Sequence, residues 1–210
     1  MIKHVLMSLM LFLSGSGMVQ AANEGKVSPW KIEADLGQAY YSGAANRDGN
    51  TALGRLSFGR DLFFTPIGTL GLEIGVQSGN TMRLNMSKEV VNALGGVPID
   101  VQIKPTLDVL IDFQSKQLNP LPLNLWLKGG IAYRSLRVDR ESINDILGYS
   151  PEFQAGIGYR INTQTTLNLG YQMILGKTPH LSINTELETG VLTHILLQQA
   201  ILMGISYHFM

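Results

Sequence analysis

Residues 195–209, ILLQQAILMGISYHF, contain the alternating pattern that decides the fold. Every second residue from Ile195 onward belongs to one set, which is apolar except at Gln199 and ends in Tyr207 and Phe209. The intervening set is small and mixed, and it becomes polar towards His208. Successive side chains of a β-strand point to opposite faces of a sheet. We therefore predict a strand with one hydrocarbon face and one mixed face.

This terminal pattern resembles the last strand of Gram-negative outer-membrane β-barrels. In that class of protein, the barrel-assembly machinery recognises a final Phe preceded by alternate aromatic and apolar residues. Tyr207 and Phe209 match the pattern, and Met210 after them departs from it. The resemblance implies an outer-membrane location, with the assembly machinery as a partner.

The beginning of the chain has the features of an export signal. Lys3 and His4 form a short positive start, residues 5–13 are apolar, and Val19-Gln20-Ala21 fits a small-x-small cleavage site. We predict a signal peptide over residues 1–21 and a single barrel domain over residues 22–210. The chain contains no cysteine, which excludes a lipoprotein anchor, disulfides and thiolate metal sites.

Composition limits the remaining classes of protein. Lys plus Arg and Asp plus Glu are equal at 16 each, so no strong electrostatic field favours a nucleic-acid partner. Charged residues make up 15% of the chain, whereas about 25% is usual for a soluble protein. After the leader, no stretch approaches the roughly 18 to 20 continuous apolar residues of a spanning helix. An exported periplasmic protein and a membrane barrel remain.

Alternation of period two decides in favour of the barrel. It recurs in eight stretches: residues 30–41, 52–64, 69–78, 99–113, 121–134, 152–161, 167–175 and 195–209. The segments between them alternate between long and short, as external loops and periplasmic turns do. We predict an all-β, eight-stranded antiparallel up-and-down transmembrane β-barrel. A strand inside residues 79–98 or 176–194 would raise the number to ten.

The two faces of these strands differ as a membrane requires. The outward face is hydrocarbon, and its aromatic residues gather where the strands are expected to meet the periplasm: Trp30, Phe64, Phe113, Tyr159, Tyr207 and Phe209. The inward face carries charges of both signs: Lys31, Glu33, Asp35, Arg55, Asp61, Glu73, Lys104, Asp108, Asp112, Lys128, Arg134, Glu152 and Arg160. Because eight strands leave room for little more than side chains, we expect a salt-bridged plug. A narrow ion path is the alternative.

Taken together, the chain resembles small outer-membrane barrels of the OmpA transmembrane-domain, OmpX and opacity-protein kind. The motifs are Tyr207-His208-Phe209 and the stretch Gly156-x-Gly158-Tyr159-Arg160, which leads through a tight turn into Leu169-Gly170-Tyr171. This resemblance implies a fold and no activity.

One short motif suggests an enzyme. His180-Leu181-Ser182, with Glu186 nearby, resembles the His-x-Ser of lipid A deacylases, which implies a Ser nucleophile with a His base and a carboxylate. Ile183 stands where that family has Asn, and the motif falls in a predicted loop. We expect a polar surface segment. No metal site is predicted, because no second His or carboxylate stands at ligand spacing from His194 or His208.

The predicted loops have helical patterns of their own. Residues 86–94, with apolar residues at every fourth position, and residues 142–147 are candidate short helices that either cap the barrel mouth or contact a partner. We expect a non-enzymatic envelope or surface-contact role without a cofactor. The expected partners are outer-membrane lipid, lipopolysaccharide and a host or envelope protein. A pore is the alternative, followed by a lipid A hydrolase.

Overall fold

The computed structural model describes residues 28–45, 48–93, 95–118, 120–140, 142–184 and 189–209. The predicted signal peptide and Glu186 lie outside these residues. The described elements are β1 (Trp30–Tyr41), β2 (Asn50–Phe64), β3 (Gly68–Gln77), β4 (Asn80–Arg83), α2 (Lys88–Ala93), β5 (Asp100–Ile103), β6 (Thr106–Ser115), β7 (Leu123–Val138), β8 (Ile146–Arg160), β9 (Thr165–Ile174), β10 (His180–Asn184), β11 (Thr189–Thr193) and β12 (Gln198–His208). Within these ranges, no helix has the length and hydropathy needed to cross a bilayer.

Eight of these strands close into a barrel. Around the wall, the order is β1, β2, β3, β6, β7, β8, β9 and β12, with antiparallel pairing throughout. Strand β12 pairs with both β9 and β1, so the sheet has no open edge around its membrane-spanning part. The predicted eight-stranded antiparallel barrel is confirmed.

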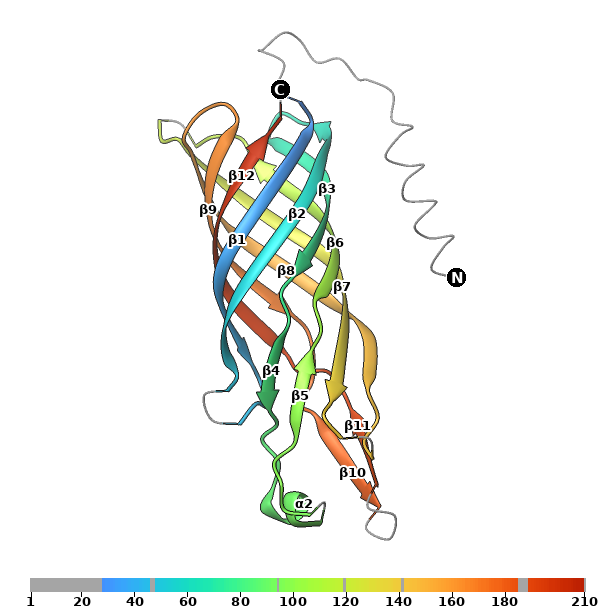
Figure 1. Cartoon of the computed structure of the whole chain (residues 1–210). Helices are drawn as coiled ribbons and strands as arrows, with labels where there is room; N and C mark the ends of the chain where they lie inside the picture. The colour runs from blue at the N-terminus through green and yellow to red at the C-terminus, as the bar shows by residue number, and fades with distance from the viewer. Residues whose placement is uncertain are drawn as a thin grey trace.

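The two ends of the barrel differ (Figure 1). At one end, called here the terminal end, the start of β1 and the end of β12 lie together among short turns. The other, called here the hairpin end, carries the β4–β5 hairpin with α2 at its tip and the β10–β11 hairpin. The β10–β11 hairpin and β4 fall in segments that we expected to be loops, whereas β5 falls inside the strand predicted over residues 99–113.

The predicted strand bounds hold to within about two residues at the terminal end, and the larger misses are at the hairpin end. β1 has the predicted bounds, whereas β7 and β8 run further and shorten the expected loop after Arg134 to seven residues, 139–145. The expected helix at 142–147 is wrong, because Ile146 begins β8. The expected helix near Met86 is present as α2, and Met86 and Val90 pack against the core of the hairpin end.

The interior consists of two layers. Towards the terminal end it is polar and charged. Towards the hairpin end it is an apolar cluster made of Ala39, Tyr41, Leu53, Met82, Leu84, Ile99, Val101, Ile103, Leu136, Val138, Ile143, Leu181, Leu192, Leu196, Ala200 and Leu202. The barrel wall therefore continues beyond its lipid-facing belt and packs there like a water-soluble protein, with an apolar core.

To make this possible, the residues that face the lumen switch parity between β5 and β6. In β6, Thr106 and Asp108 point inward, whereas in β5 the inward residues are Val101 and Ile103. The predicted single strand over residues 99–113 assumed unbroken alternation and placed Ile99, Val101 and Ile103 outside. That placement is wrong, because an apolar exterior is favourable against lipid and unfavourable against water.

Candidate functional site

The charged layer of the lumen centres on Glu73 of β3. Its carboxylate accepts hydrogen bonds from Lys128 Nζ at 3.0 and 3.1 Å and lies 2.8 Å from Arg55 Nη2. Lys128 also donates to Glu33 at 3.0 Å. These side chains come from β1, β2, β3 and β7 and are almost fully buried, so the contacts connect separate parts of the wall across the lumen.

Other ion pairs surround this centre. Arg55 binds Asp108 in a fork, with Nε 3.1 Å from Oδ2 and Nη2 2.6 Å from Oδ1. Asp35 lies 3.7 Å from the same guanidinium, and Lys31 donates to Asp112. Forked, charge-assisted bonds are among the strongest polar contacts in proteins. Each cation of the network thus has at least one carboxylate, which is the condition for burying a charge.

Between the charged and apolar layers lies a band of amides. Gln172 donates to Glu152 at 2.6 Å and to Gln77 at 2.9 Å, and Gln154 donates to Glu152 at 2.6 Å. Beyond this band, Arg134 Nη1 donates to the backbone oxygen of Leu196 at 2.7 Å. These glutamines were not among the predicted site residues because they are uncharged. Their inward parity was the available signal.

Towards the terminal end, the indole of Trp126 lies across the lumen. A Cβ added to Gly170 would lie 2.2 Å from its Cη2, and one added to Gly156 would lie 2.4 Å from its Cζ2. The two glycines are cross-strand partners, so together they make the flat surface on which the indole rests. The cavity at this end, lined in part by Lys31, Lys128 and Trp126, measures ≈ 10 Å³, about the space of one water.

Most of the predicted lumen charges do lie inside the barrel. The buried ones are Lys31, Glu33, Asp35, Arg55, Glu73, Asp108, Asp112, Lys128, Arg134 and Glu152. Asp61 lies towards the terminal end, 3.5 Å from His208 Nε2.

Two of the predicted lumen residues lie elsewhere. Lys104 stands where β5 and β6 change faces, and its Nζ donates outside the barrel to Gln102 at 2.9 Å. Arg160 is the last residue of β8 and is exposed, because the strand ends at the turn there. Placing these two residues in the lumen was therefore wrong.

All six predicted rim aromatics lie at or near strand ends at the terminal end. They are Trp30, Phe64, Phe113, Tyr159, Tyr207 and Phe209. Trp30 stacks on Phe58 with ring centroids 5.1 Å apart, and the Arg60 guanidinium carbon lies 4.9 Å from its ring centre. Tyr133 and Tyr149 form a second pair 5.4 Å apart, nearer the hairpin end. Aromatic side chains at both ends of an apolar belt are typical of a barrel that crosses a membrane.

The candidate enzyme motif lies on β10 rather than in a loop. His180 and Ser182 are both exposed and stand two residues apart, on one face of the strand. Among the described residues, no hydrogen bond joins their side chains, and no group of three His, Asp or Glu side chains could hold a metal ion. The predicted third member, Glu186, is outside the described range. Within the described ranges, the proposed nucleophile Ser182 and base His180 are therefore not paired.

The closed sheet, the hydrocarbon exterior and the aromatic ends define a small transmembrane β-barrel of the outer-membrane class. Exposed apolar side chains cover the outside of every barrel strand, among them Leu36, Phe58, Ile74, Ile111, Leu127, Phe153, Leu169 and Met203. A sheet in a membrane pairs all of its backbone groups only if it is closed. The chain is an outer-membrane barrel protein.

Comparison with solved structures agrees with this class. Neisserial surface protein A (NspA) matches with a TM-score of 0.53 and 12% identity, over 88% of this chain and 99% of that one. The outer membrane protein OprG from Pseudomonas aeruginosa matches with a TM-score of 0.51 and 12% identity, over 88% of this chain and 98% of that one. At this identity the likeness shows the fold alone. No family model matches the sequence, and neither does any curated protein.

Proposed function

We propose that this protein is a non-enzymatic outer-membrane barrel with a closed lumen, which presents its hairpin end to a protein partner outside the cell. The observation that carries the proposal is the filled interior. Ion pairs and amides occupy the half towards the terminal end, and a continuous apolar cluster occupies the other half. A solute would have to displace both layers, so transport is the weaker candidate.

The hairpin end supports a role in contact. Leu181 and Leu192 of the β10–β11 hairpin, and Leu84 and Ile99 beside the β4–β5 hairpin, belong to the apolar cluster. These projections are therefore packed onto the barrel, and segments held on a rigid scaffold often carry recognition. Val97 and Val191 leave apolar side chains exposed there, at 60% and 56%.

The contact role is tested by the binding of cells that express the protein to host-cell surfaces. We expect the double variant Val97→Ser with Val191→Ser to bind less than wild type. Ile67→Ser is the matched control, because Ile67 is 72% exposed in the turn at the terminal end. If wild-type cells bind no better than cells without the protein, the contact role fails.

Conductance measurements across a planar bilayer distinguish the pore alternative from a closed barrel. The filled lumen predicts no steps of ion current from the wild-type protein, and regular steps would favour the pore.

The hydrolase alternative requires Ser182. Mass spectra of lipid A from cells with wild type and with Ser182→Ala should be identical, and a difference between them would favour the enzyme.

A further inference from the structure

The inward-facing set of residues switches parity between β3 and β4 and between β5 and β6. At this switch, the backbone pairing between the two chain segments is interrupted. Pairing of β3 with β6 ends at Gln77 and Thr106, and pairing of β4 with β5 resumes at Asn80 and Ile103. The residues between, 78–79 and 104–105, are not paired across the gap. Pro105 has no N–H with which to bridge it.

Each unpaired segment is instead hydrogen-bonded to the strand on its other side. The backbone N–H of Ser78 donates to the oxygen of Gly54 on β2 at 2.8 Å, and that of Lys104 donates to the oxygen of Ser135 on β7 at 2.9 Å. Strands β2 and β7 thus hold the two sides of the gap. The gap is a defined feature of the barrel wall.

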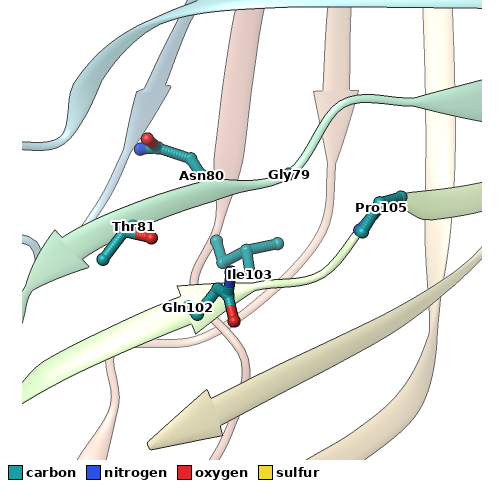
Figure 2. Close-up of a pocket in the computed structure, with 6 residues that line it drawn as sticks. All are labelled: Gly79, Asn80, Thr81, Gln102, Ile103 and Pro105. Atoms are coloured by element: carbon teal, nitrogen blue, oxygen red, sulfur yellow. The ribbon is translucent and has the colours of Figure 1, made fainter. Parts of the chain in front are cut away.

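A recess of ≈ 490 Å³ opens at this place (Figure 2). Its lining is Gly79, Asn80, Thr81, Gln102, Ile103 and Pro105. Amide and hydroxyl groups supply its polar atoms, and none of these residues is acidic. On the outer face these groups belong to Thr81 and Gln102, whereas the Asn80 side chain shares the inward side of β4 with Met82, and its Oδ1 accepts from the Thr51 hydroxyl at 3.2 Å. The Lys104 ammonium stands at the edge, hydrogen-bonded to Gln102. The recess therefore offers donors and one positive charge.

Its position along the barrel limits the ligand. Val76 and Leu107 are cross-strand partners on the terminal-end side of the recess, and their side chains are exposed on the outer surface at 41% and 54%. On the other side, the outward residues are Thr81 and Gln102, which are polar. The recess thus lies where the hydrocarbon belt gives way to a polar surface. A molecule bound there has one end in lipid and the other in water.

We infer that this recess binds the phosphorylated sugar head group of an outer-leaflet lipid. The phosphate accepts from Lys104 Nζ, the hydroxyl group of Thr81 and the amide group of Gln102 contact the sugar, and the acyl chains lie along Val76 and Leu107. The volume is within the range of about 300–1,000 Å³ typical of small-molecule sites. This site lies on the flank of the barrel and does not depend on what the hairpins contact.

The test is titration of the purified protein in detergent with diphosphorylated lipid A, followed by native mass spectrometry. We expect one lipid per barrel at low concentration and a dissociation constant about ten-fold higher for Lys104→Ala, because a charge-assisted hydrogen bond is lost. Lys104→Arg should restore binding. Lys177→Ala is the matched control, because Lys177 is also exposed towards the hairpin end but lies between β9 and β10.

Two further ligands separate a lipid site from a site for free anions. Dephosphorylated lipid A should bind the wild-type protein about as weakly as diphosphorylated lipid A binds Lys104→Ala. Inorganic phosphate at the same concentration should not displace the lipid. The inference is overturned if Lys104→Ala and Lys177→Ala bind lipid A equally, or if phosphate alone displaces it. Circular dichroism shows whether each variant keeps its strands.

Discussion

Glu73→Gln tests whether the ion network holds the barrel closed. The substitution keeps the size of the side chain and removes its charge, so it leaves no cavity. Removing one partner of a buried ion pair costs about 3–5 kcal/mol. Lys128 keeps Glu33 and Arg55 keeps Asp108 as partners. We therefore expect a loss near the lower limit, about 3 kcal/mol of the free energy of unfolding.

Urea unfolding in lipid vesicles, followed by tryptophan fluorescence, measures this loss. Trp126 reports on the lumen because Lys128 Nζ lies 5.3 Å from its ring centre. With a slope of about 2 kcal/mol per molar urea, the midpoint should fall by about 1.5 M. Glu89→Gln is the control, since Glu89 is exposed on α2 and should change stability by no more than about 0.5 kcal/mol. Equal midpoints for the two variants would refute the reasoning.

Three further outcomes follow from single contacts. Gly170→Ala should lower the free energy of unfolding by about 1–3 kcal/mol, measured by the same urea titration, because the new Cβ would lie 2.2 Å from an indole carbon. Since the chain has no cysteine, Gln102→Cys should react quickly with a membrane-impermeant maleimide and Ile103→Cys should not; the opposite order would contradict the change of faces. The hydrogen bond from Arg83 lowers the pKa of Asp48. The stabilisation that this bond gives the folded protein is therefore present above the ordinary pKa of Asp, and it is lost as the pH falls through the lowered pKa. Arg83→Gln should return that pKa to its usual range in an NMR titration.

The membrane-spanning part of the fold could be predicted because lipid imposes a strict pattern. Each strand there must show hydrocarbon to the outside at every second residue, and the inward set is then free to be polar. This is why β1 has the predicted bounds and why Glu73 and Lys128 were expected in the lumen. Their pairing across 55 residues could not be predicted, because it depends on the stagger of the closed sheet.

The hairpin end could not be predicted from alternation alone. Residues 99–103 alternate in the same way whether the apolar set faces lipid or a core, and only the surrounding medium decides between them. The available signals were Gly79 and Pro105, which are both poor strand residues and lie in the two unpaired segments where the strands change faces. Taking these residues as a break would have placed Lys104 outside the lumen.

The two layers of the interior bear on function together. Where lipid surrounds the wall, the outside is already apolar, so charged side chains can fill the lumen provided that each cation has a carboxylate. Where water surrounds the wall, the lumen carries the apolar core that holds the hairpins. An ion entering from the hairpin end would first lose its water in the apolar cluster and then displace paired charges. This order of barriers supports the closed scaffold that we propose over a pore, and it leaves the hairpins and the outer flank as the surfaces that we propose for binding.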